Sequence, residues 1–131
     1  MTSSERLAVR GIVLEMVRRG VGKPILLLHG FQTVDPEARF LDLLGQRGEI
    51  IAPSGPGFGH SPRPPDFDTV YDLVHLYLEV LEILPGDKVT LLGFSFGGWL
   101  AAEVAAACSH RLDKLVLVDP LGIKKIGRAH V

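Results

Sequence analysis

Short apolar runs along this chain alternate with longer segments in which apolar residues recur at helical spacing. Four runs are almost free of polar residues, as expected of strands buried on both faces of a sheet. They are residues 24–28, 49–52, 89–92 and 114–118. Helical periodicity or an alanine-rich composition marks residues 36–46, 69–84 and 99–108. Strands and helices that alternate through short connections predict a parallel sheet in a three-layer α/β fold.

The clearest predicted helix spans residues 69–84. Asp68 or Thr69 can cap its start, and the Pro-Gly-Asp sequence at residues 85–87 ends it. One face of this helix should pack on the sheet, because its apolar residues repeat every three or four positions. These are Val70, Leu73, Val74, Tyr77, Leu78 and Leu81.

Two weaker patterns flank the first buried run. Residues 7–16 partly alternate between apolar and polar, which predicts one or two entry strands closed by a turn at residues 18–23. Residues 36–46 predict a short surface helix with Asp35 as its N-cap and Pro36 in the first turn.

A single serine lies between a predicted strand and a predicted helix, in the sequence Gly93-Phe94-Ser95-Phe96-Gly97. A serine on a sharp strand-to-helix turn crowds its neighbours, so the residues two before and two after it must lack a Cβ. Such a turn costs about 1–3 kcal/mol and persists only where packing enforces it. Ser95 Oγ would then stand at the carboxyl end of the sheet, where the N–H groups that open the helix favour negative charge.

Three motifs in order resemble those of the α/β-hydrolase family. Residues 29–31, HGF, resemble its HG oxyanion turn; residues 52–61, APSGPGFGHS, resemble its A-P-D-x-P-G-F-G-x-S loop; and residues 93–98, GFSFGG, resemble its nucleophile elbow. The resemblance covers residues 11 to about 124. It implies the family's mostly parallel three-layer sheet, in an incomplete form that lacks the last strands, the cap and the triad histidine.

The resemblance also implies roles for individual residues. Ser95 would be the nucleophile of a hydrolase that acts on an ester or related carbonyl substrate through an acyl-enzyme. The N–H groups of Phe31 and Phe96 would bind the oxyanion, and each such donor contributes about 10²–10³ in kcat. His29 is better explained as a residue that holds the HG turn by hydrogen bonding than as a general base.

The acid and base of a catalytic triad are not evident. Asp119 follows the last predicted strand, where a minority of the family has the triad acid, but an aspartate before proline also suits a strand exit. In the family the histidine lies after the final strand. We therefore expect residues 1–131 to form a single partial domain, the N-terminal part of a hydrolase, which is inactive in isolation.

The last six residues are expected to be non-native. Residues 126–131, IGRAHV, resemble the translation of an adapter oligonucleotide used in short-read sequencing. His130 is for this reason rejected as the catalytic base. Ser54 stands where the family usually has aspartate, which should remove a hydrogen-bonding group from that loop.

Phosphate binding by the glycine-rich loop is excluded, whereas three other functions on this fold stay open. The glycines of residues 53–62 do not form a phosphate cradle, because the extended sequence Pro-Arg-Pro-Pro follows in place of a helix. Three alternatives to an esterase-like hydrolase stay open: a non-catalytic ligand-binding protein on the same fold, an acyltransferase and a carbon–carbon bond hydrolase.

Composition limits the partners, the disulfides and the location that we expect for this protein. The net charge of −1 provides no electrostatic footprint for nucleic acid or an anionic membrane. Cys108 is the only cysteine, which excludes an intrachain disulfide and predicts a buried small hydrophobe. His75 and His110 are expected on the surface. No signal peptide or membrane span is evident, so we expect a cytoplasmic protein with a small-molecule substrate and neither metal nor cofactor. The oligomeric state is left open.

Overall fold

The computed structural model describes residues 5–65, 67 and 69–121. Its elements in chain order are β1 (Glu5–Val9), β2 (Ile12–Arg19), β3 (Pro24–Leu28), α1 (Arg39–Leu44), β4 (Glu49–Pro53), α2 (Val70–Ile83), β5 (Val89–Phe94), α3 (Phe96–Ala107), the 3₁₀ turn η1 (Ser109–Arg111) and β6 (Leu112–Val118). The expected tail at 126–131 lies outside the described residues, as do His130 and Asp68.

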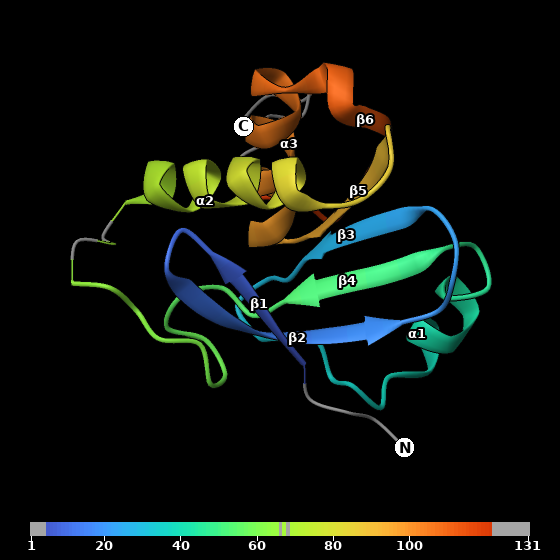
Figure 1. Cartoon of the computed structure of the whole chain (residues 1–131), viewed down its shortest axis with the longest axis horizontal. Coiled ribbons are helices and arrows are strands. Elements are labelled where there is room, and N and C mark those ends of the chain that lie inside the picture. Colours follow the sequence, from blue (N-terminus) through green and yellow to red (C-terminus); the bar gives the residue numbers. More distant parts are fainter. Residues whose placement is uncertain (1–4, 66, 68, 122–131) are drawn as a thin grey trace, which may run out of the picture.

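The six strands form one sheet in the order β1-β2-β4-β3-β5-β6. Strands β4, β3, β5 and β6 run parallel to one another, whereas β1 pairs antiparallel with β2 and β2 pairs antiparallel with β4 (Figure 1). The mostly parallel sheet predicted from the apolar runs is confirmed. All four runs are strands of its parallel part.

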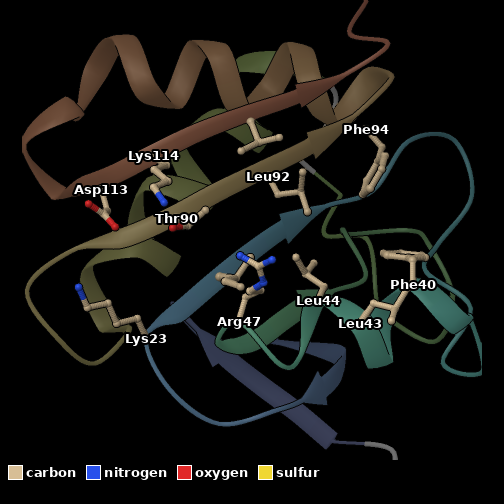
Figure 2. Close-up of a pocket in the computed structure, with 12 residues that line it drawn as sticks. Lys23, Phe40, Leu43, Leu44, Arg47, Thr90, Leu92, Phe94, Asp113 and Lys114 are labelled. Atoms are coloured by element: carbon tan, nitrogen blue, oxygen red, sulfur yellow. The ribbon is translucent and has the colours of Figure 1, made fainter.

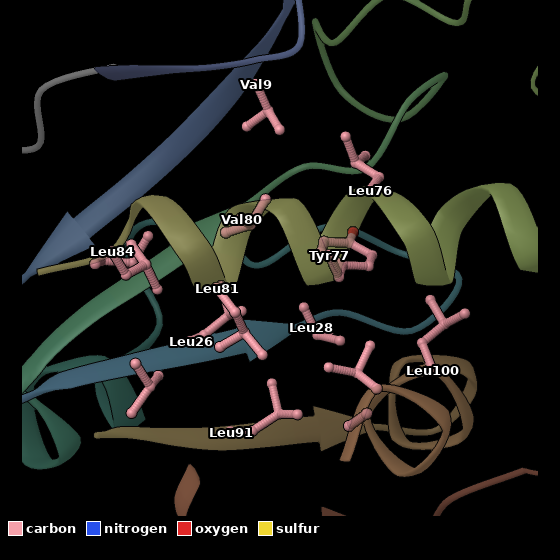
Figure 3. Close-up of a cluster of buried hydrophobic side chains, with 14 of the residues drawn as sticks. Val9, Leu26, Leu28, Leu76, Tyr77, Val80, Leu81, Leu84, Leu91 and Leu100 are labelled. Carbon is pink, nitrogen blue, oxygen red and sulfur yellow. The ribbon is translucent and has the colours of Figure 1, made fainter. Parts of the chain in front are cut away.

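Helices cover both faces of the sheet. Successive side chains of a strand point to opposite faces, so neighbouring residues of one strand pack against different helices. Leu26 and Leu28 of β3 belong to a buried cluster with residues of α2 and α3 (Figure 3). Ile25 and Leu27 point the other way and pack with Leu41 of α1. Burying one leucine completely contributes about 1.5–3 kcal/mol, so these two clusters hold the three layers together.

The predicted helix at residues 69–84 is confirmed as α2. Thr69 is its N-cap: Thr69 Oγ1 accepts a hydrogen bond from the Asp72 N–H (3.2 Å), and Asp72 Oδ2 accepts one from the Thr69 N–H (3.0 Å). Tyr77 and Leu81 are buried against the sheet, as the helical spacing predicted. Burial raises the pKa of the Tyr77 phenol.

The N-terminal segment forms a hairpin of two strands. Arg10 and Gly11 connect them with φ of 51° and 79°, the left-handed conformation that two-residue hairpin turns require. Entry strands were predicted, but this turn was not located, because Arg10 is not a residue typical of it. Strand β2 then continues to Arg19.

The helix predicted at residues 36–46 is shorter than expected, and Asp35 is not its N-cap. Ala38 precedes α1 in an extended conformation with no side-chain cap. Asp35 Oδ1 instead accepts a hydrogen bond from the Glu37 N–H (2.9 Å). The side chain therefore closes a separate turn ahead of the helix, which begins only at Arg39.

Burial near the end of the described chain differs in part from what was predicted. The apolar run at residues 114–118 predicted a strand buried on both faces, whereas a partial domain was expected to leave the edge of this strand open. Strand β6 is the edge strand of the described sheet, so Leu115 and Val116 are 40% and 42% exposed. Cys108 was expected to be buried within a helix. Helix α3 starts earlier than predicted and ends at Ala107, which leaves Cys108 half-buried at its C-cap.

Candidate functional site

Ser95 lies on the turn between β5 and α3, with φ of 55° and ψ of −118°. Residues other than glycine rarely adopt this conformation, which costs about 1–3 kcal/mol. Surrounding backbone holds it in place. The Ser95 N–H donates to the Val118 carbonyl (2.9 Å), and the Ser95 carbonyl accepts from the N–H groups of Gly98 (2.9 Å) and Leu121 (3.0 Å). A strained strand-to-helix turn is therefore present, enforced by α3 and the end of β6.

Two glycines allow the close packing around this turn. A Cβ at Gly97 would overlap the carbonyl oxygens of Leu28 and His29, and a Cβ at Gly93 would overlap the carbonyl oxygen of Gly97. Neither glycine has a positive φ. The turn therefore requires the absence of a side chain at these positions, as the spacing of the motif predicted, and it does not require unusual backbone freedom.

The turn that follows β3 meets the Ser95 turn. A Cβ at Gly30 would lie 3.2 Å from Ser95 Cβ and 3.3 Å from the Phe94 carbonyl oxygen. Within the described residues, the N–H groups of Phe31 and Phe96 donate no hydrogen bond. Two unpaired amide donors thus lie on the two segments that meet at Ser95.

His29 is buried beside this turn and uses both ring nitrogens. Its Nδ1–H donates to the Gly30 carbonyl (2.7 Å), and its Nε2 accepts from the Gly55 N–H (2.9 Å). The nitrogen that accepts carries no proton, so the imidazole is neutral. Burial also lowers its pKa. His29 therefore holds the turn, as predicted, and has no ring nitrogen left to accept a proton from Ser95.

Glu15 of β2 anchors the glycine-rich loop that follows β4. Its Oε2 accepts a hydrogen bond from His60 Nδ1 (2.7 Å), and its Oε1 accepts one from the His60 N–H (3.1 Å). These bonds lower the pKa of the Glu15 carboxyl. On the backbone side, the Glu15 N–H donates to Ser61 Oγ (2.8 Å), whose hydroxyl donates to the Ser54 carbonyl (2.7 Å).

Ser54 was expected to leave this loop without a hydrogen-bonding group. In the structure Ser54 still takes part in hydrogen bonds, both to Glu15: Ser54 Oγ donates to Glu15 Oε1 (3.5 Å), and the Ser54 N–H donates to the Glu15 carbonyl (2.7 Å). Glu15 was not identified from the sequence. A charged residue in an alternating strand is typical of a solvent-facing position. No local signal distinguishes a glutamate that faces solvent from one that anchors a distant loop.

Asp119 directly follows β6, where it is exposed and has φ of 46°. Among the described residues, its carboxylate takes part in no hydrogen bond or ion pair, so it is not brought together with a histidine. His75 and His110 are exposed, as predicted. No histidine within residues 5–65, 67 and 69–121 hydrogen-bonds to Ser95 Oγ.

A hollow of about 790 Å³ lies on the sheet, and Ser95 is not among the residues that line it. Its lining includes Ile25, Leu92, Lys114 and Val116 of the strands and Phe40 and Leu43 of α1 (Figure 2). It corresponds to a face of β3, β5 and β6 that α1 covers only in part, so it is not the site around the serine.

In the described part of the chain, no group of three or more potential metal ligands occurs, and every helix is too short or too polar to cross a membrane.

This fold and site define a class of protein: an α/β protein with a serine on a strained turn at the carboxyl end of a parallel sheet. The family model for the alpha/beta hydrolase fold matches residues 23–130. The chain belongs to this family.

Individual relatives are hydrolases. The chain is 33% identical over 125 residues to the 2-hydroxy-6-oxo-2,4-heptadienoate hydrolase of Pseudomonas putida, covering 86% of this chain and 43% of that protein. Among solved structures, a membrane phospholipase A described as a bacterial virulence factor superposes with a TM-score of 0.85 at 26% identity, covering 97% of this chain and 42% of that one. A meta-cleavage product hydrolase superposes with a TM-score of 0.80 at 28% identity, covering 93% and 47%. The chain thus spans less than half the length of these relatives.

Proposed function

We propose that the protein is a serine hydrolase that cleaves an ester or related carbonyl substrate through an acyl-enzyme at Ser95. Ser95 Oγ attacks the carbonyl carbon while its proton passes to a base, and the C–O bond then breaks as the alcohol leaves with a proton. Water attacks the acyl-enzyme and releases the acid. The observation that carries the proposal is the strained backbone of Ser95, because such strain is retained where function uses it.

The oxyanion that forms during this attack would be bound by the N–H groups of Phe31 and Phe96. Their lack of another acceptor among the described residues supports this role, as does the close approach of Gly30 to Ser95. Phe96 also opens α3, where the helix dipole favours negative charge. Each donor would contribute about 10²–10³ in kcat.

We further propose that the 131-residue chain alone turns over esters very slowly. None of the four described histidines hydrogen-bonds to Ser95 Oγ, and without a base the hydroxyl stays protonated. Loss of the base costs about 10⁶ in kcat in a comparable serine hydrolase. Asp119 stays a prediction for the triad acid. Acyl transfer at a serine needs neither a metal nor an organic cofactor. The proposed substrate is a small molecule, and the proposed location is the cytoplasm.

A second candidate is hydrolysis of a carbon–carbon bond. Two relatives are named for meta-cleavage products or for an oxo-heptadienoate, a compound with a ketone and no ester. Hydrolysis at that ketone breaks a carbon–carbon bond, and the same serine can attack it. The two candidates differ in substrate and share the nucleophile, so a panel of p-nitrophenyl esters and 2-hydroxy-6-oxo-dienoates separates them.

A fluorophosphonate probe tests the nucleophile, with peptide mapping by mass spectrometry. It is applied to the full protein that the gene encodes. The 131-residue chain alone, in which no described histidine bonds to Ser95 Oγ, is treated in parallel and should be labelled far more slowly. Label should be found on Ser95 and be lost in Ser95→Ala, while Ser109→Ala, which changes an exposed serine, should label like the wild type. Equal labelling of the Ser95→Ala variant would remove the basis of the proposal.

A further inference from the structure

Two phenylalanine rings stack beside Ser95. The ring centroids of Phe31 and Phe96 lie 5.4 Å apart, with 18° between their planes. Trp99 meets Phe96 edge-on, at 5.9 Å and 82°. These three side chains, here termed the aromatic platform, come from the turn after β3 and the first turn of α3. The platform therefore spans the same two segments that meet at the serine.

The outer ring of the platform is left largely in water. Phe31 is 66% exposed, although a phenylalanine stabilises a protein mainly by being buried. Its position is nevertheless defined, because one side of the ring contacts Phe96, which Trp99 supports in turn. A ring that is held in place before binding can stack on a planar group without a large ordering cost.

Phe31 lies close to where a substrate carbonyl would react. It follows Gly30, and a Cβ at Gly30 would lie 3.7 Å from Ser95 Oγ. The Phe31 ring also stacks on Phe96, which directly follows Ser95, so the ring borders the space that a group attached to the carbonyl carbon would enter. A saturated group of equal size would cover a similar apolar area, but it would lack the favourable geometry of stacked π-systems.

We infer that Phe31 is a specificity-determining residue, and that it selects substrates with an aryl or other planar conjugated group next to the reactive carbonyl. This inference rests on the proposed function, because Ser95 must hold the carbonyl carbon for the ring to contact the neighbouring group. Stacking of this kind changes affinity by about 2- to 10-fold.

Two boronic acids test the inference without turnover. Phenylboronic and cyclohexylboronic acid are similar in size, but only the first is planar. In each case the electron pair of Ser95 Oγ forms a B–O bond, the hydroxyl proton passes to the buffer, and boron becomes a tetrahedral anion that keeps both hydroxyl groups. Trp99 is the only tryptophan, so its fluorescence reports binding. Dissociation constants are measured for the wild type, Ser95→Ala, Phe31→Leu, Phe31→Met and Phe31→Tyr.

For each variant we take the ratio of its affinity for phenylboronic acid to its affinity for cyclohexylboronic acid, and compare this ratio with that of the wild type. The two acids differ in acidity, but this difference is the same for every variant and therefore cancels. This ratio should fall about 5-fold in Phe31→Leu and Phe31→Met and be retained in Phe31→Tyr. An unchanged ratio in the folded Leu and Met variants, with binding still dependent on Ser95, overturns the inference and leaves the proposed function standing. If neither acid binds in a Ser95-dependent way to the full protein that the gene encodes, the proposed function fails and the inference fails with it.

Discussion

His29 and Gly55 are joined by a hydrogen bond of 2.9 Å, in which the Gly55 N–H donates to the imidazole Nε2 across 26 positions of sequence. The opposite ring nitrogen donates to the Gly30 carbonyl. One buried, neutral imidazole therefore connects the glycine-rich loop after β4 to the turn that meets Ser95. This arrangement explains why a histidine next to a candidate nucleophile is structural.

Replacing His29 should destabilise the fold. In His29→Ala the buried Gly55 N–H loses its acceptor and a cavity forms, so the free energy of unfolding should fall by about 2–3 kcal/mol. Urea denaturation measures this change. His75→Ala, at an exposed position of α2, serves as the control and should stay within about 0.5 kcal/mol of the wild type. Equal stability of the two variants would contradict the proposed role of the imidazole.

Stability should also depend on pH through His29. Its folded-state pKa is lowered by burial from the ordinary value of 6.5. The unfolded chain therefore binds a proton first as the pH falls, and stability is lost from about pH 6.5 downward until the folded-state pKa is reached. The slope for one proton is at most about 1.4 kcal/mol per pH unit. Denaturation between pH 7.5 and 5 should show a steeper loss for the wild type than for His29→Gln, and parallel curves would argue against this linkage.

Gly97→Val should abolish catalysis and weaken the fold. Its side chain would overlap the carbonyls of Leu28 and His29, so we expect a loss of about 3 kcal/mol and more than a 100-fold drop in Ser95 labelling rate. Ala106→Val, at an exposed position of the same helix, is the matched control and should change both quantities little. Gly86→Ala is unsuitable for comparison, because Gly86 has φ of 85° and its substitution would also strain the backbone. Normal labelling of Gly97→Val would show that the turn at Ser95 is not needed.

The exposed edge strand β6 should make the 131-residue chain associate with itself. An uncovered edge with apolar side chains offers a template for strand pairing, and Val116 is 42% exposed on it. Val116→Lys should therefore raise the monomer fraction seen by size-exclusion chromatography with light scattering. Val21→Lys places the same charge on an apolar loop residue that is 89% exposed, away from that edge, and should have no such effect. A monomeric wild type at all concentrations would refute the prediction.

Much of the fold is encoded in local patterns. The four apolar runs predicted the parallel strands, and the repeat of apolar residues from Val70 to Leu81 predicted α2, because burial on one or both faces leaves a periodic trace in the residues themselves. The strained turn at Ser95 was predicted for a similar reason. Its steric requirement falls on residues two positions away, Gly93 and Gly97, so the requirement is visible in a short stretch.

Other features depend on which distant segments meet, and local patterns do not contain that information. Glu15 bonds to His60 across 45 positions, and nothing near either residue marks the contact. The exposure of Leu115 follows from the place of β6 at the edge of the described sheet, although its apolar run is indistinguishable from that of a central strand. The sequence alone therefore determined the elements and the strained serine. The tertiary structure decided which side chains surround them, because hydrogen bonding and burial are set by neighbours that are remote in sequence.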